Sequence, residues 1–256
     1  MQTVGNRSEL VRGLQERAAR AQPAEQVERI DGWWLRRAPG SAWWVGSVLP
    51  HGASGPDAVL RGVLQAEQFY AGHGGVARFQ ISPAAGPEGL DAVLAARGYR
   101  RHSAVSLQVA PVARVREHAG ATPLRVRRAD RPTRAWRMAR QAVTGAAGDA
   151  RAEGELLDRV ALPSAYACAV LGDEVVAVGR AVLDTGWAGV FDLATLPRAR
   201  GRGAARQVLA ALAGWAGAHG ADAMYLQVER DNVPALRLYE RAGFRELCEY
   251  HYRTAE

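Results

Sequence analysis

Lysine is missing from this chain of 256 residues, so all 33 of its Lys or Arg positions are arginine. Without a lysine, the chain cannot form a Schiff base with a carbonyl compound or with pyridoxal phosphate, and it lacks the phosphate-binding amine of a P-loop. Arginine gives the chain a formal net charge of +7 at pH 7. The abundance of alanine and glycine indicates a GC-rich coding sequence as one reason for arginine in place of lysine.

Cysteine is scarce, and long apolar runs do not occur. Cys168 and Cys248 lie in apolar or strand-like runs without metal-ligand spacing, so we expect reduced, buried thiols. No stretch of about 18 apolar residues occurs, so we expect no membrane-spanning helix and no membrane partner. Residues 1–21 lack the apolar core of a signal peptide, which favours a cytoplasmic location. The histidines show no metal-ligand spacing either, and we expect no metal site.

The composition is that of a globular protein, with 48% hydrophobic and 23% charged residues. Domains commonly contain ~100–200 residues, so the length allows one large domain or two modest ones. Residues 110–122 have Pro111 and Pro123 at their ends, carry charges and have no sustained period, which is typical of a connection. We therefore predict an N-terminal domain over 1–112, a linker over 113–122 and a C-terminal domain over 123–256.

Apolar periodicity and turn residues predict an α/β (α+β) fold. In the second half we expect strands joined as an antiparallel meander, then alternating helices and strands: helices over 131–143, 152–162, 203–219 and 234–242, and strands over 165–171, 175–183, 187–195, 223–228 and 244–253. In the first half we expect helices over 8–21, 57–71 and 90–96, and strands over 32–37, 42–49, 77–81 and 103–109. Strands 32–37 and 42–49 are expected to form a hairpin.

The two halves share a weak internal repeat at an offset of 145 residues. This offset aligns Gly98-Tyr99-Arg100 with Gly243-Phe244-Arg245. It also aligns Phe79-Gln80-Ile81 with Met224-Tyr225-Leu226, and each of these segments precedes a helix that ends at the aligned glycine. The repeat indicates a duplicated α/β unit.

A loop rich in arginine and glycine joins a predicted strand to a predicted helix at Arg200-Gly201-Arg202-Gly203-Ala204-Ala205. The first turn of a helix has unpaired N–H groups and a partial positive charge, and glycine lets an anion approach the backbone. A diphosphate fits such a junction without a lysine. The Walker motif and the dinucleotide fingerprint do not match, because the Gly-Lys-Ser/Thr triplet and a parallel βαβ unit are both missing. A loop that serves only tight packing is the alternative.

Two motifs in the second half resemble those of a known enzyme superfamily. The segment 193–205 matches the acetyl-CoA motif Arg/Gln-x-x-Gly-x-Gly/Ala of the GNAT superfamily, and segments 226–232 and 235–244 match its second motif. Residues 124–253 thus resemble a complete GNAT unit. The first half resembles a degenerate one, so the fold expected is two GNAT-like mixed-sheet units in tandem with the catalytic unit second.

The resemblance implies a role for each matching residue. The strand before the loop would hold the acetyl carbonyl and the pantetheine arm through Leu193, Ala194 and Thr195. The loop would bind the diphosphate through Arg200, Gly201, Arg202, Gly203, Ala204, Ala205 and Arg206. Asn232 would contact the cofactor arm, or cap the following helix, or do both.

Tyr239 matches the general acid of the superfamily, which protonates the leaving thiolate; a buried packing role is the alternative. The base that receives the amine proton has three candidates, Asp192, Glu229 and His251, and a chain of waters is a fourth possibility. In the first half, the offset places Leu94 at the position of Tyr239 and Pro87 at that of Asn232. The first half is therefore expected to bind no CoA.

The function implied is acetyl transfer from acetyl-CoA directly to the amine of a small molecule or a peptide. The alternative is a non-catalytic GNAT-like protein that senses acyl-CoA or binds anions. We expect the acceptor between the halves, against Trp34 or Trp44 and near Asp192; packing is the other explanation for these rings. Segment 125–140 carries seven arginines, which indicates a solvated face, since no nucleic-acid motif accompanies it.

Overall fold

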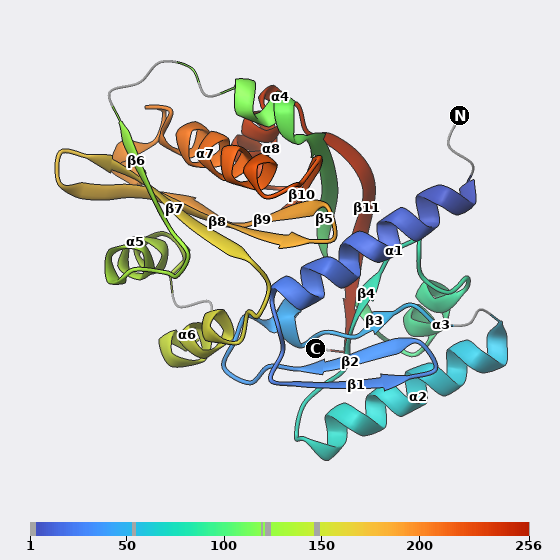
Figure 1. Ribbon diagram of the computed structural model, residues 1–256. Helices are drawn as coiled ribbons and strands as arrows, with labels where there is room; N and C mark the ends of the chain where they lie inside the picture. The colour runs from blue at the N-terminus through green and yellow to red at the C-terminus, as the bar shows by residue number, and fades with distance from the viewer. Residues whose placement is uncertain (1–3, 53–54, 119, 121–123, 146–148, 256) are drawn as a thin grey trace.

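The computed structural model describes residues 4–52, 55–118, 120, 124–145 and 149–255 (Figure 1). A large sheet of eight strands dominates it, in the order β4 (Arg78–Ile81), β11 (Arg245–Thr254), β5 (Arg100–Pro111), β10 (Ala223–Glu229), β9 (Trp187–Thr195), β8 (Glu174–Asp184), β7 (Ser164–Leu171) and β6 (Arg125–Ala129). A small antiparallel sheet contains β1 (Gln26–Ile30), β2 (Trp33–Arg37) and β3 (Leu49–Pro50).

Helices cover both faces of the large sheet. Alternate residues of β7 divide between the faces: Ala165, Ala167 and Ala169 join the core under α7, whereas Tyr166 and Cys168 pack with α5. The face under α7 also carries α8 and α4; their bounds are α7 (Ala204–Ala218), α8 (Val233–Arg241) and α4 (Val112–Glu117). The opposite face carries α1 (Val4–Ala21), α5 (Arg134–Thr144) and α6 (Ala150–Asp158).

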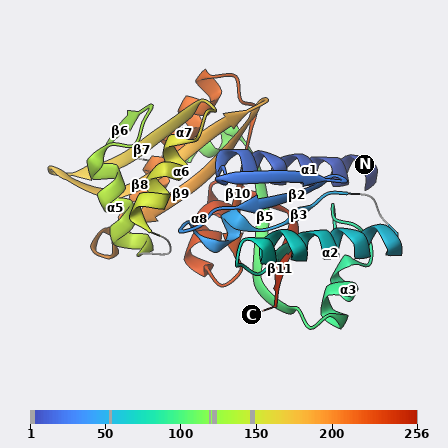
Figure 2. The same cartoon turned by 90° about the horizontal axis from the view of Figure 1, so that it is seen from below.

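The small sheet lies between α1 and the helices α2 (Pro56–Gly72) and α3 (Leu90–Ala96), as the view from below shows (Figure 2). Trp34 and Leu49 pack with Ala19 of α1 on one side. Trp33 and Leu35 face the other side, in a core that includes side chains of α2 and α3. Helix α1 thus connects the small sheet to the face of the large sheet that it covers.

The 145-residue repeat corresponds to matching elements in the structure. The offset places α2 on α7, β4 on β10, α3 on α8 and β5 on β11. The last strands of the two halves lie side by side, because β5 pairs with both β10 and β11, and β11 pairs with β4. Strands β4 and β5, which precede the predicted linker, therefore pair with β10 and β11, which follow it. The large sheet contains strands from both halves of the chain.

The predicted linker is not wholly irregular. Of residues 113–122, positions 119, 121 and 122 lie outside the described residues, while α4 occupies the start of the segment and packs on α7. Val112 and Val115 are buried there. Their spacing of three residues is helical, and it marks the apolar side of this short helix.

The predicted hairpin of the first half is wrong. Strand β2 pairs mainly with β1, and the segment expected as a strand forms a 3₁₀ turn, η1 (Trp43–Gly46), followed by the short β3. The reason is Arg36, a buried side chain: its Nε donates to the carbonyl of Ser47 at 2.9 Å, and its Nη2 donates to the carbonyl of Trp44 at 3.2 Å. The guanidinium satisfies carbonyl groups that a strand partner would otherwise have bonded.

None of the helices in the described part of the chain has both the length and the apolar character needed to cross a bilayer. The described residues also contain no group of three or more His, Cys, Asp or Glu side chains placed to hold a metal ion.

Candidate functional site

Strands β9 and β10 separate part-way along their length. They pair in parallel from Trp187 and Ala223 up to Val190 and Leu226. Beyond that pair, β9 stays bonded to β8 as far as Thr195, and β10 stays bonded to β5 as far as Glu229. The two strands therefore open between these outer partners, and backbone groups of β9 lose their neighbour on that side.

A bulge in β9 lies at this opening. The register with β8 shifts between the pairs Val178–Ala194 and Arg180–Phe191, so Asp192 and Leu193 stand opposite Gly179 alone. Asp192 has φ 55°, in the left-handed region that a non-glycine residue rarely adopts. A bulge of this kind bends a strand and re-aims its side chains, and the surrounding contacts must hold the conformation.

The N-terminus of α7 lies at the end of the loop that follows β9. Helices α5, α6 and α8 begin with a side-chain cap, from Thr133, Asp149 and Asn232. Helix α7 instead begins at Gly203, with φ 78° and no side-chain cap. The first turn thus presents its N–H groups without a competing side chain, as an anion site requires.

Arginines surround this helix end. Arg200 and Arg202 are exposed, and Arg206 is partly buried. The Nε of Arg206 is buried and has no hydrogen-bond acceptor among the residues described. Gly201 also has a positive φ, of 75°, and a Cβ there would meet nothing within 4 Å. An open glycine loop with an unused guanidinium N–H fits a diphosphate.

Helix α8 brings two predicted site residues to the opening. Asn232 caps the helix, its Oδ1 accepting from the amide of Ala235 at 3.3 Å. Tyr239 is buried, with its ring edge-on to Phe244 at 5.8 Å between centroids. Burial raises the pKa of Tyr239 to about 12, so its phenol keeps its proton throughout the neutral range.

A cavity of about 400 Å³ lies where these elements meet. Its walls include the opened ends of β9 and β10, Asn232 and Tyr239 of α8, and side chains of α5 and α6. The first half contributes Trp43 and Trp44 of η1, and β11 contributes Tyr250 and Tyr252. The volume lies within the usual range for small-molecule sites.

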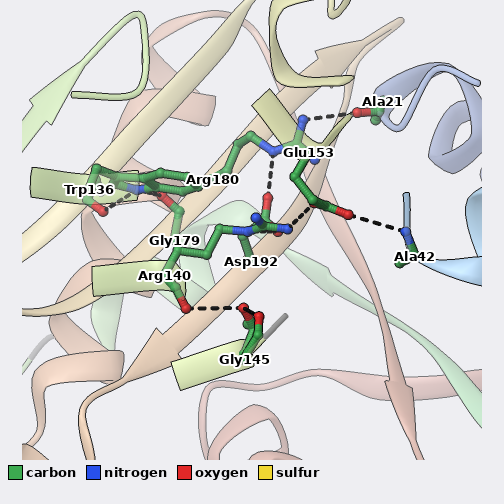
Figure 3. Close-up of polar contacts among 11 residues, drawn as sticks. Ala21, Ala42, Trp136, Arg140, Gly145, Glu153, Gly179, Arg180 and Asp192 are labelled. Carbon is green, nitrogen blue, oxygen red and sulfur yellow. Dashed lines mark hydrogen bonds and ion pairs between the residues drawn. The ribbon is translucent and has the colours of Figure 1, made fainter. Parts of the chain in front are cut away.

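Asp192 borders the cavity and is held by two arginines (Figure 3). Arg140 Nε donates to Oδ1 at 2.8 Å, and Arg180 Nε donates to Oδ2 at 2.9 Å. Its side chain is only 10% exposed, so burial alone would raise its pKa. The two guanidiniums outweigh burial and hold the pKa of Asp192 below its ordinary value.

The same network reaches the first half of the chain (Figure 3). Arg180 Nη1 donates to the carbonyl of Ala21 at 2.9 Å, at the end of α1. Arg140 Nη2 donates to Glu153 at 2.6 Å, and Glu153 accepts from the amide of Ala42 at 3.2 Å, next to Trp43. The buried cluster formed by Arg140, Arg180, Asp192 and Glu153 therefore contacts both the bulge of β9 and the start of η1. We call η1, which carries Trp43 and Trp44, the aromatic turn.

The other predicted base residues lie in different surroundings. Glu229 is exposed, borders the cavity, and forms no ion pair with any residue that the structure describes. His251 is buried and does not border the cavity; its Nε2 lies 2.8 Å from Asp91 Oδ1. Burial lowers the pKa of His251 below its ordinary value despite that carboxylate.

Of the two predicted acceptor tryptophans, the structure brings only Trp44 to the cavity. Trp34 packs on Ala19 and Leu49, and the guanidinium carbon of Arg29 lies 4.1 Å from its ring centroid. The sequence reasoning missed Trp43, Tyr250 and Tyr252. It also missed Arg180, although an arginine within the apolar run Val175–Leu183 indicates a buried ion pair.

Comparisons with known proteins agree with this geometry. The family described as "Probable histone acetyltransferase Rv0428c C-terminal" matches residues 8–253. The "Uncharacterized N-acetyltransferase YobR" of Bacillus subtilis is 27% identical over 254 residues, covering 95% of this chain and 98% of that protein.

Solved structures share the fold over nearly the whole chain. A GCN5-related N-acetyltransferase from Kribbella flavida superposes with a TM-score of 0.71 and 16% identity, covering 96% of this chain and 95% of the other. A tandem GNAT protein from the clavulanic acid biosynthesis pathway superposes with a TM-score of 0.67 and 14% identity, covering 97% of this chain and 87% of the other. The prediction of a tandem GNAT-like α/β fold is confirmed. The chain belongs to the family that its residues 8–253 match, and it is a GNAT-type N-acetyltransferase.

Proposed function

We propose that this enzyme transfers the acetyl group of acetyl-CoA directly to the amine of a small molecule that occupies the cavity between the halves. One observation carries the proposal: the β9/β10 opening, helix α8 with Tyr239, and the aromatic turn of the first half all border one cavity. The uncapped end of α7 follows β9 after a short loop, which suits a donor that reaches from that loop into the cavity.

The chain offers separate places for the parts of acetyl-CoA. The backbone of Leu193, Ala194 and Thr195 would hold the acetyl and pantetheine portions, with Leu193 free of a β8 partner because of the bulge. The diphosphate would bind the loop and the first turn of α7, at Arg200, Gly201, Arg202, Gly203, Ala204, Ala205 and Arg206. The bound thioester supplies an electrophilic carbonyl; orientation and proton movement belong to the protein.

Tyr239 would supply a proton to the departing sulfur. The amine nitrogen forms a bond to the acetyl carbon, the bond from that carbon to sulfur breaks, and the sulfur acquires negative charge. The buried phenol, which is fully protonated at neutral pH, gives its proton to that sulfur, and the phenolate regains a proton from water in the cavity before the next turnover. Asn232 borders the same cavity and would orient the pantetheine arm while it caps α8.

Glu229 would receive the proton of the amine, because it borders the cavity and is exposed to solvent, to which it can pass the proton on. Asp192 has both carboxylate oxygens engaged by guanidiniums, which leaves it poorly suited as a base. We assign Asp192 a positioning role instead: it holds the strained bulge of β9 at the acetyl-binding edge.

The test is acetyl transfer from acetyl-CoA across a panel of amines, with mass spectrometry of the products. A product heavier by one acetyl group and stoichiometric release of free CoA are expected. The description of the matching family names a histone acetyltransferase, so the panel includes a lysine-containing histone-tail peptide. Tight CoA binding without transfer to any amine would support the alternative, a protein that senses acyl-CoA.

A further inference from the structure

The charges that border the cavity are mostly neutralised within the protein. Arg140 pairs with both Glu153 and Asp192, at 2.6 Å and 2.8 Å. Arg137 pairs with Asp158 at 3.1 Å. Glu229 therefore stands out among the described residues of the cavity wall as a carboxylate without a cationic partner. A ligand with one positive charge would supply the cationic partner that Glu229 lacks.

Aromatic rings form the wall next to that carboxylate. The ring of Trp43 lies edge-on to Trp44 at 5.8 Å and to Tyr252 at 4.7 Å, and Tyr252 lies 5.7 Å from Tyr250. Glu229 stands opposite Val105 of β5, and Val105 stands opposite Tyr250 of β11, so the carboxylate and the Tyr250 ring lie on the two strands that flank β5 in the same cavity wall. Trp43 and Trp44 are partly exposed, which leaves ring surface for a ligand.

The wall offers little to a second charge on the ligand. An amino acid would need a guanidinium for its carboxylate, and both arginines of the wall already bind carboxylates. A polyamine or a basic peptide would need several unpaired acids, and the wall presents Glu229. A flat apolar body, in contrast, matches the rings of Trp43 and Trp44.

We propose that the acceptor is a primary amine with a single positive charge on an aromatic body, a compound of the arylalkylamine class. The ammonium group binds Glu229, and the aromatic ring packs against Trp43 and Trp44. This inference rests on the proposed acetyl transfer and adds the class of acceptor. It also gives the first half a role in the reaction, because Trp43 and Trp44 come from that half.

Matched acceptors test the proposal with the wild-type enzyme and acetyl-CoA. 2-Phenylethylamine and phenylalanine differ only by a carboxylate, and 2-phenylethylamine and spermidine differ in aromatic surface and charge. We expect kcat/KM for 2-phenylethylamine to exceed both others by about 10-fold or more. A higher kcat/KM for spermidine, phenylalanine or a lysine-containing peptide would overturn the acceptor class while leaving acetyl transfer intact. Failure to acetylate any amine would overturn the proposed function itself.

Variants locate the recognition on the cavity wall. Trp43→Ala should raise KM for 2-phenylethylamine by about 10-fold and leave KM for acetyl-CoA unchanged, while Trp43→Phe should recover most of the loss. Trp34→Phe is the matched control, since that ring lies away from the cavity: it should change thermal stability without changing the preference among amines. An unchanged preference in a folded Trp43→Ala enzyme would contradict the proposal. If Trp43→Ala does not fold, the wild-type acceptor panel decides.

Discussion

The two halves of the chain carry matching elements, yet the corresponding helices α7 and α2 begin with different residues. Helix α7 begins at the uncapped Gly203, its first turn contains no acidic residue, and arginines flank it. Its counterpart α2 begins with Gly55 and Pro56 and carries Asp57 in the first turn. Proline removes one N–H, and the aspartate places negative charge where an anion would bind.

The described residues just before the loop that leads into α2, His51 and Gly52, pack against other parts of the protein. His51 is buried, and its ring nitrogens lie 3.1 Å from Glu16 and 3.0 Å from Gln15 of α1. A Cβ on Gly52 would come within 2.3 Å of the ring of Trp33. These differences are why we propose that CoA binds at the start of α7 and not at the start of α2. The first half retains the sheet and contributes a wall of the cavity.

The largest effect is expected from a charge at the start of α7. Gly203→Asp should lower the affinity for CoA by about 100-fold or more. The reason is that it places a negatively charged carboxylate at the position proposed for the diphosphate, where the two charges repel each other. Gly203→Asn is the matched control: it has the same shape, tolerates a positive φ, and carries no charge. It should lose far less affinity in calorimetric titrations with CoA. Equal losses in the two variants would assign the effect to backbone strain.

Removing the phenol of Tyr239 should be next in size. Tyr239→Phe should lower kcat by about 10²–10⁴-fold with little change in CoA affinity. Its pKa of about 12 also predicts that kcat will not fall through loss of this proton between pH 7 and pH 10. At the equivalent position the first half has Leu94, which is fully buried. An unchanged kcat in Tyr239→Phe, measured where chemistry limits the rate, would show that Tyr239 only packs in the core, as Leu94 does.

The cluster that joins the halves should matter for stability. Asp192→Asn leaves two partly or fully buried arginines without their shared carboxylate and should cost about 3–5 kcal/mol of unfolding free energy. The pKa of Asp192 is lower in the folded protein, so its stabilising contribution is present above the unfolded pKa and is lost as pH falls through the folded pKa. Denaturant titrations of both proteins at pH 7 and pH 3.5 should show the difference shrinking at the lower pH.

Asp158→Asn is the control for that experiment, because it breaks an exposed pair with Arg137. It should change stability by less than about 1 kcal/mol. A loss as large as that of Asp192→Asn would show that charge removal anywhere near α5 has the same effect, and it would contradict the special role of the buried cluster.

A smaller effect is expected where α3 of the first half contacts β11. Asp91 bonds Arg253 at 2.7 Å and His251 at 2.8 Å, and the bond to Arg253 is the main cause that lowers the pKa of Asp91 to about 2. Because Asp91 is about half exposed, Asp91→Asn should cost about 1 kcal/mol at neutral pH. The difference should persist above about pH 4 and shrink as pH falls toward 2, as thermal melts in the two pH ranges would show. A constant difference across that interval would exclude the ion pair as its source.

The sequence predicted the second half well, because its strands and helices carry clear periods and are separated by glycine and aspartate turns. It missed β6, whose Arg125, Arg127 and Arg128 are exposed on an edge strand and conceal the pattern. It also gave the wrong structure for residues 42–49. There the buried Arg36 donates hydrogen bonds to the carbonyl groups of Trp44 and Ser47, which follow it by 8 and 11 residues. Tertiary hydrogen bonds of this kind leave no local periodicity.

For the site, local motifs were informative and long-range contacts were not. The glycine loop, Asn232 and Tyr239 follow from short spacings, and the structure brings Asn232 and Tyr239 to one cavity. The surroundings of Asp192 depend on Arg140, which lies 52 positions away along the chain, and on the fold that brings the two together. Which tryptophan faces the cavity depends on the unexpected turn η1.

The number of CoA molecules bound per chain distinguishes one cofactor site from two. Calorimetric titration of the wild-type chain with CoA should give one site per chain, because α7 begins among arginines without an acidic residue, whereas its counterpart α2 begins with a proline and an aspartate. The Asp57→Asn variant, which removes the acidic residue from α2, should still bind one equivalent. Two equivalents of CoA per wild-type chain, or one equivalent retained with full affinity in Gly203→Asp, would contradict the account.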